Sequence, residues 1–232
     1  HEAGGDTGPR EMVIGASDAS NTEGAKNIPY AIANLFVSFA MVNPGIPVGY
    51  WRSVGSSQNA YITECFFDEL AALAGKDPLQ ARLELMEGHP RHAGVLRLAA
   101  EKAGYGQPLP AGHAHGMAVA ESFGSFVAQV AEVSIERGRV RVHRITCAVD
   151  CGMVVNPDSI RAQMEGAIAF GLTAALKSEI TIQDGHPVQR NFDDFALLRI
   201  DEMPDADVHI QPSREHPGGI GEPGVPPAAP AV

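Results

Sequence analysis

Apolar residues recur at helical spacing in the first half of the chain. In the stretch that ends at Gly75, the apolar positions are Tyr61, Ile62, Cys65, Phe66, Leu70 and Leu73. Asp77 and Pro78 then form a helix start, with Asp77 as the cap, and this helix is predicted to run to about Met86. A third helix is predicted over residues 91–103, before Gly104.

The second half alternates between apolar and polar positions, which is typical of strands. Three strands are predicted, at residues 117–120, 126–135 and 140–150. The Arg137-Gly138 turn between the last two indicates a β-hairpin, and shorter strands are expected at 179–182 and 207–211. On this pattern His143 lies on the polar side of its strand, so a surface histidine is expected.

A late helix is expected to begin at Asn156-Pro157. Its apolar residues repeat every four positions, at Ile160, Met164, Ile168, Leu172 and Leu176. Gly166 and Gly171 interrupt this helix, and each costs about 1 kcal/mol relative to alanine. We therefore expect other parts of the chain to pack closely at both glycines.

Residues 34–42 form an apolar run with aromatic and β-branched side chains. The run predicts a buried strand that stops at Asn43-Pro44-Gly45. The wider apolar stretch, 28–42, is interrupted by Asn34 and Ser38 and is shorter than the ~20 residues of a membrane helix. We therefore predict no transmembrane segment.

These elements together predict an α+β fold in which mixed sheets are flanked by helices. Residues 1–104 form a helix-rich part, in which 1–27 are a loop-like lead-in, and residues 105–232 form a strand-rich part. The glycine- and proline-rich segment 105–115 is interpreted as the linker between them.

Composition narrows the possible functions. The 232 residues are 44% apolar and 19% charged, which is typical of a globular protein, and 28 acidic against 17 basic side chains give a net charge of −11. Binding to nucleic acid or to an anionic membrane is therefore disfavoured. The three cysteines, Cys65, Cys147 and Cys151, form no CxxC pair and are expected to be buried thiols.

The tail, residues 218–227, holds one carboxylate among glycines and prolines. Three of the four residues before Glu222 are glycines, which let a backbone approach other groups closely, and Pro223 restricts the residue before it to extended geometry. A carboxylate on such a loop suits a general base. The alternative is a flexible chain end, for which this composition is also typical.

A Gly/Ser-rich turn at residues 53–58 is a second candidate site. It leads into a helix, whose free N–H groups could bind an anion or a metal-bound oxygen. The simpler alternative is an ordinary serine N-cap. A serine hydrolase that uses Ser53 or Ser56 is poorly supported, because neither lies in a Gly-x-Ser-x-Gly elbow.

His113-Ala114-His115 could in principle ligate a metal, but no third ligand is near in sequence. A solvated loop is the better interpretation, and no metal ligand is predicted from the side chains.

Four ordered stretches resemble the molybdenum-binding subunit of the xanthine oxidase superfamily, most of all isoquinoline 1-oxidoreductase β-subunits and related aldehyde dehydrogenases. The first is Gly49-Tyr50-Trp51-Arg52-Ser53-Val54-Gly55-Ser56-Ser57. The others are residues 121–133, residues 149–166 with Val149-Asp150-Cys151-Gly152 and Gln163-Met164-Glu165-Gly166, and the tail.

This resemblance implies roles for particular residues. Glu222 would be the general base beside molybdenum, and Arg52 would position the substrate and stabilise developing negative charge. Gln163 and Gly221 would lie near the pterin cofactor, and the backbone of Val54, Gly55 and Ser56 near the metal. The implied cofactor is molybdopterin in its cytosine dinucleotide form with molybdenum, and the implied substrate is an aldehyde or an N-heteroaromatic compound.

The chain also departs from the family. Family subunits are far longer, and neither the Gly-Gly-Gly-Phe-Gly loop nor the Gly-Gln-Gly loop is present, so we expect a piece of a subunit whose remainder lies elsewhere. Electrons would leave through a separate [2Fe–2S] subunit. The compartment is left open between cytoplasm and periplasm. The alternative function is a non-catalytic assembly or docking module that keeps the scaffold without cofactor, with a mobile tail.

Overall fold

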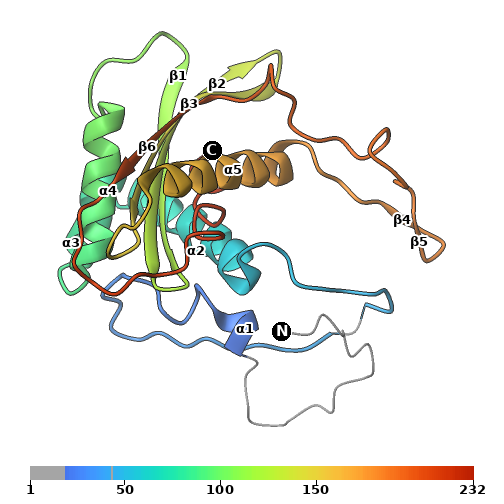
Figure 1. Ribbon diagram of the computed structural model, residues 1–232, viewed down its shortest axis with the longest axis horizontal. Helices are drawn as coiled ribbons and strands as arrows, with labels where there is room; N and C mark the ends of the chain where they lie inside the picture. Colours follow the sequence, from blue (N-terminus) through green and yellow to red (C-terminus); the bar gives the residue numbers. More distant parts are fainter. Residues whose placement is uncertain (1–18, 43) are drawn as a thin grey trace.

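A computed structural model describes residues 19–42 and 44–232, and Figure 1 shows their arrangement. In chain order the elements are α1 (Ala19–Thr22), α2 (Val54–Leu73), α3 (Pro78–Leu85), α4 (Pro90–Ala103), β1 (His113–Ser122), β2 (Ser125–Glu136), β3 (Arg139–Asp150), α5 (Pro157–Leu176), β4 (Ile182–Gln183), β5 (His186–Pro187) and β6 (Asp205–Ile210). The predicted α+β class is confirmed. Within the described residues, no helix combines the length and apolarity that crossing a bilayer requires.

The main sheet has the strand order β1-β2-β3-β6, and β4 pairs with β5 in a separate small ribbon. β1, β2 and β3 are antiparallel, whereas β6 joins β3 in parallel. The predicted Arg137-Gly138 hairpin is confirmed, and both residues have positive φ, 52° and 77°, as this kind of two-residue turn requires. Phe123 and Gly124 make the same turn between β1 and β2.

The sheet separates two hydrophobic cores because successive strand residues point to opposite faces. Met117 and Val119 of β1 belong to the core that contains α4, whereas Ala118 between them belongs to the core that contains α5. α4 packs across β1, β2 and β3, and α5 packs on β3 and β6. The helices before residue 104 therefore share their core with the strands after it.

The predicted helix boundaries hold where the sequence supplies a cap. Asp77 accepts a hydrogen bond from the Gln80 backbone N–H at 3.0 Å, as the predicted start of α3 requires. α4 ends at Gly104 in the left-handed conformation, with φ 68°. The Asn156 side chain caps α5 by accepting from the N–H groups of Asp158 and Ser159.

The predicted buried strand at residues 34–42 is wrong. These residues form no strand, and most of their side chains are exposed, Phe36 by 89%. The apolar pattern is that of a strand, but no described strand lies beside it to complete a ladder. The residues form no strand because a strand needs a neighbouring strand to accept and donate its backbone hydrogen bonds.

The interpretation of His113-Ala114-His115 as a solvated loop is also wrong, because β1 begins at His113. His113 Nδ1 lies 2.6 Å from Glu132 Oε1, and its ring stacks on His143 at 4.2 Å between centroids. His143 is consequently half-buried, and its Nε2 lies 2.7 Å from Ser134 Oγ. Among the described residues, no three His, Cys, Asp or Glu side chains are grouped so that they could hold a metal ion.

Helix α2 forms where the helical spacing of apolar residues predicts it, but it buries a different face from the one that carries those residues. Ile62, Phe66 and Leu70, which the pattern marks as apolar, are exposed. The buried side includes Phe67 and Glu64. Burial of Glu64 is the reason for this orientation, because its carboxylate has its partners inside the fold.

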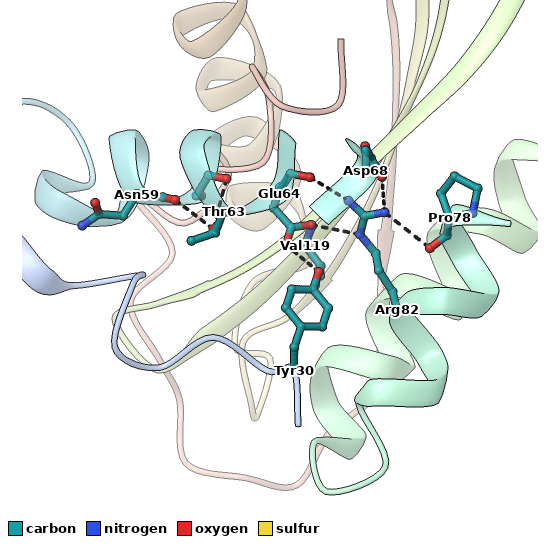
Figure 2. A network of polar contacts seen from close by, with 9 residues as sticks. Tyr30, Asn59, Thr63, Glu64, Asp68, Pro78, Arg82 and Val119 are labelled. Carbon is teal, nitrogen blue, oxygen red and sulfur yellow. Dashed lines mark hydrogen bonds and ion pairs between the residues drawn. The ribbon is translucent and has the colours of Figure 1, made fainter. Parts of the chain in front are cut away.

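Figure 2 shows the polar network around Glu64. Arg82 Nε donates to Glu64 Oε2 at 3.1 Å, and its Nη1 donates to Asp68 at 2.5 Å. Tyr30 donates to Glu64 Oε1 at 2.5 Å, and the Val119 N–H donates to Oε2 at 3.0 Å. One carboxylate thus joins α2, α3, β1 and the segment that carries Tyr30.

The Glu64–Arg82 pair is buried on both sides, with side-chain exposures of 2% and 0%. Burial raises the pKa of Glu64, and Arg82 is the largest opposing influence. Burial by itself would lower the pKa of Arg82, but Glu64 and Tyr30 raise it above its usual range. We take the pair as ionised, because the guanidinium stays charged and the carboxylate accepts three hydrogen bonds.

The cysteines are free thiols. Cys147 and Cys151 are buried, as predicted, whereas Cys65 is half-buried. Burial raises the pKa of Cys147 to about 12, so this thiol stays protonated at neutral pH.

Removal of the Arg82 charge should destabilise the fold strongly. In Arg82→Met the carboxylate of Glu64 would remain buried without its cation, which costs about 3–5 kcal/mol of unfolding free energy. Urea denaturation measures the change. The control is Lys76→Met, which breaks the exposed pair with Glu84 and should cost about 0–1 kcal/mol. Equal losses in both variants would contradict the role of the buried pair.

Stability should also fall on acidification because of His92. Burial lowers the pKa of His92 to about 4, and its Nε2 has no hydrogen-bond partner among the described residues. Between pH 6.5 and pH 4 the unfolded chain binds this proton and the folded chain does not, so stability decreases as pH falls, by on the order of 3 kcal/mol.

In His92→Leu, the free energy of unfolding measured across this pH range should no longer show this decrease on acidification. The matched control, His186→Leu in the exposed strand β5, should retain it, since this change leaves His92 in place. An unchanged slope in His92→Leu would refute the assignment.

Candidate functional site

The C-terminal tail is fixed against the sheet. The Gly218 N–H donates to Cys151 O at 2.9 Å, and the Gly219 N–H donates to Phe123 O at 2.7 Å. Deeper in, Gln129 Nε2 donates to Gly224 O at 2.7 Å, and residues 223–228 are buried. The interpretation of the tail as a flexible chain end is therefore wrong.

Glycines allow the tail to come this close. A Cβ on Gly218 would lie 2.5 Å from the Gly124 carbonyl oxygen, and one on Gly224 would lie 2.7 Å from Ala167 Cβ of α5. On the other side of this contact, a Cβ on Gly171 would lie 2.6 Å from Ala228 Cβ. The predicted close packing is confirmed at Gly171, but nothing lies within 4 Å of Gly166.

The structure brings Arg52, Gln163, Gly221 and Glu222 together. Arg52 Nε donates to Gly221 O at 2.9 Å, and Nη2 donates to the same oxygen and to Gln163 Oε1 at 3.3 Å. Ser53 Oγ donates to Glu222 O at 2.6 Å. The carbonyl groups before and after the Glu222 Cα are thus both held by the segment before α2.

Ser53 acts differently from the ordinary N-cap that was the simpler expectation. Its side chain makes no capping hydrogen bond, and both Ser53 and Val54 have left-handed backbones, with φ 74° and 48°. Such a conformation costs a β-branched residue on the order of 1–3 kcal/mol. In this conformation the hydroxyl bonds the backbone of Glu222.

Gly55 and Ser56 are buried, and the space beside Gly55 is filled by α1. A Cβ there would lie 2.0 Å from the Ser20 carbonyl oxygen. Gly55 therefore has a packing role in this fold. The first turn of α2 contains no acidic side chain, so the positive end of this 20-residue helix is not neutralised within its own sequence.

Two aromatic residues complete the surroundings of Arg52. The rings of Trp51 and Phe170 lie 4.9 Å apart, and Arg52 Cζ lies 5.6 Å from the centroid of Phe170. Phe170 and Gln163 are both on α5, two turns apart. Packing on Phe170, together with the Gly221 and Gln163 oxygens, fixes where the guanidinium lies.

Sequence reasoning missed the residues that hold the site from behind. Gln129 is fully buried in β2, and Ser125 Oγ donates to Gly219 O at 2.6 Å. A glutamine inside the apolar run of residues 126–131 was a usable signal, since buried polar side chains need partners. The contacts of Ser53 and Phe170 had no comparable signal, because they are set by segments far apart in sequence.

This arrangement brings a carboxylate and a guanidinium onto contacting segments of the chain, since Arg52 donates to the carbonyl oxygen of the residue before Glu222. Glu222 is half-buried on a pinned backbone, and its carboxylate oxygens accept no hydrogen bond from a described residue. The Arg52 guanidinium and the Gln163 amide add donors, and the start of α2 adds positive potential. The predicted free N–H groups are not found at Val54 and Ser56, which donate to Trp51 O at 2.8 Å and to Ser53 O at 3.0 Å. The donor set therefore fits an anionic, oxygen-rich group bound beside Glu222.

Comparison with protein families gives a match to the family model described as "Molybdopterin cofactor-binding domain", over residues 70–204. This range includes Gln163 but neither Arg52 nor Glu222.

Curated bacterial proteins match most of the chain. It is 37% identical over 205 residues to the "Membrane-bound aldehyde dehydrogenase [pyrroloquinoline-quinone]" of Gluconacetobacter polyoxogenes, which covers 79% of this chain and 26% of that protein. It is 33% identical over 192 residues to the beta subunit of isoquinoline 1-oxidoreductase from Brevundimonas diminuta, covering 81% and 25%. The chain thus spans about a quarter of the length of these relatives.

Among solved structures, the aldehyde oxidoreductase of Desulfovibrio desulfuricans ATCC 27774 aligns with a TM-score of 0.62 at 12% identity, over 76% of this chain and 38% of that one. At this identity the likeness concerns the fold alone.

Two glycines of α5 offer a matched test of the tail contact. Gly171→Ala would place a methyl group against Ala228, and such overpacking costs about 1–3 kcal/mol. Gly166→Ala meets open space and should stabilise the helix by up to about 1 kcal/mol. Denaturation gives both values. Hydrogen exchange of residues 218–232 should increase in Gly171→Ala alone, and equal exchange in both variants would contradict the contact.

Proposed function

Because the chain belongs to the molybdopterin cofactor-binding family of the xanthine oxidase superfamily, we propose that it carries the general base of a molybdenum hydroxylase, Glu222. The proposed reaction is the oxidation of an aldehyde or an N-heteroaromatic compound with oxygen derived from water. The observation that carries this proposal is the geometry around Glu222, whose loop is clamped by Arg52 and Ser53 while its carboxylate stays free of described partners.

The proposed cofactor is molybdopterin with molybdenum, in its cytosine dinucleotide form. When bound, it supplies the redox centre that accepts two electrons from the substrate. Gln163, Gly221 and the backbone of Val54, Gly55 and Ser56 would lie beside it. There the positive end of α2 would favour anionic groups, since the Val54 and Ser56 N–H groups already donate to Trp51 O and Ser53 O. The donor-rich side chains at this place support the assignment, and the rest of a cofactor site would come from the remainder of the subunit.

Glu222 would take up the proton released as the oxygen nucleophile forms. Its backbone is held on both sides, so the carboxylate needs little reorganisation to accept that proton. Pro223 limits the torsions of Glu222 further, since the residue before proline stays extended.

Arg52 would orient the substrate and stabilise negative charge that develops on its oxygen or ring nitrogen. The guanidinium cannot turn freely, because Gly221 O and Gln163 Oε1 accept from its Nε and Nη2. Its Nη1 donates to no described residue, so this group is available to a substrate.

Two partners are proposed. Two of the relatives are, by name, single subunits of larger enzymes, one an isoquinoline oxidoreductase and the other a nicotinate dehydrogenase, and this chain covers 25% and 19% of them. We infer that the remainder of the molybdenum subunit completes the site, and that a [2Fe–2S] subunit accepts the electrons. The alternative, a non-catalytic docking module, predicts a mobile tail, and the buried tail weighs against it.

Replacement of the base tests the proposal. In Glu222→Gln within the complete enzyme, kcat should fall by about 10²–10⁴-fold while molybdenum content stays at the parent level. Dye-linked turnover and metal analysis measure both quantities. The matched control is Glu215→Gln, an exposed carboxylate earlier in the chain, which should keep parent kcat. A fully loaded Glu222→Gln enzyme with the parent rate would disprove the base, and an assembled but metal-free parent complex would favour the docking module.

A further inference from the structure

Residues 34–42 have the sequence of a strand but no partner. Figure 1 draws them as part of a long trace without helix or strand. Within the part of the chain that the structure describes, the backbone N–H groups of residues 33–42 donate no hydrogen bond to another backbone group. A run of unpaired backbone donors and acceptors of this length can pair with a strand of another chain segment, as the edge strand of a sheet does.

The exposure of the side chains alternates as in a strand. Leu35 and Phe39 are 49% and 38% exposed, and Val37 between them is half-buried. On the opposite side, Phe36 and Val42 are 89% and 79% exposed. One side of the segment is therefore less exposed than the other, and both sides present apolar side chains to the surroundings.

The segment also lacks the features that normally protect an edge. No charged residue occurs from residue 27 to residue 51, in a chain with a net charge of −11. Exposed edges are usually guarded by lysines, prolines or bulges, so an uncharged apolar edge is typical of one that another strand covers.

The chain is held directly before the segment and again ten residues after it, at Arg52. Before it, the Ala31 N–H donates to Leu85 O at 2.8 Å, and Tyr30 belongs to the Glu64 network. After it, the chain reaches Arg52 at the candidate site. A strand that paired here would lie on the chain that leads directly to Arg52.

We propose that residues 34–42 are a β-strand that completes the edge of a sheet in the remainder of the molybdenum subunit. This inference rests on the proposed function. The remainder is the occupant because the chain spans only about a quarter of its relatives, and because the segment is continuous with the site that the remainder would complete. Backbone hydrogen bonds would give the affinity, and Phe36 and Val42 would enter the partner's core.

Hydrogen exchange in the complete molybdenum subunit tests the pairing. Alternate amides within residues 34–42 should exchange at least about a hundredfold more slowly than the amides of an unstructured peptide of the same sequence. Neighbouring amides, which would face away from the partner strand, should be less protected. Uniformly fast exchange across residues 34–42 would overturn the proposal.

Two adjacent proline variants separate strand pairing from side-chain docking. Val37→Pro and Ser38→Pro remove consecutive N–H groups, of which only one would face the partner. That variant should raise exchange of the neighbouring amides by about tenfold or more, and the other by less than about threefold. Equal increases of amide exchange in the two proline variants would contradict strand pairing.

Other outcomes identify a wrong occupant or a wrong function. Protection that depends on protein concentration and accompanies homodimerisation would assign the edge to a second copy, and would refute the remainder of the subunit as partner. If the amides of residues 34–42 are protected but Glu222→Gln keeps the parent rate, the strand inference holds and the proposed general base is wrong.

Discussion

The close approach of the tail to the sheet and to α5 is the constraint on which the candidate site depends. Four hydrogen bonds join residues 218–224 to the sheet and its loops, besides those from Arg52 and Ser53. Three glycine contacts leave no room for a single methyl group. Protein interiors tolerate little change in volume, so this contact has essentially one geometry. The position of Glu222 is therefore set by the contact of the tail with the sheet and α5.

A second constraint, the buried Glu64–Arg82 pair, fixes the other half of the site. Arg52 and Ser53 lie immediately before α2, and the rotation of that helix follows from the need to turn Glu64 towards Arg82, Tyr30 and Val119. A buried charge allows few alternatives, because any other orientation would leave it unpaired. Charge thus determines the orientation of a helix whose apolar pattern alone predicts a different face.

The sequence was sufficient where a local signal determined the structure. Asp77, Gly104 and Asn156 marked helix ends, and Arg137-Gly138 marked a hairpin, because caps and turns depend on a few adjacent residues. The identities of Arg52, Gln163 and Glu222 came from motif resemblance, and their proximity follows from the structure. Sequence reasoning failed at residues 34–42 and on the exposed face of α2, since apolar patterns report that a surface is to be covered but not by which chain. It also missed Ser53 and Gln129, whose partners lie about 170 and 95 residues away.

The sequence distance between Arg52 and Gly221, 169 residues, has a consequence for how the protein is made. During synthesis the hairpins and α5 are complete before the tail leaves the ribosome, and loop closure over such a distance is among the slowest steps of folding. The candidate site therefore assembles late, on a scaffold that is already formed. A chain that stops before residue 218 would keep the sheet, α4 and α5 but would lack Glu222 and the two carbonyl oxygens to which Arg52 and Ser53 donate.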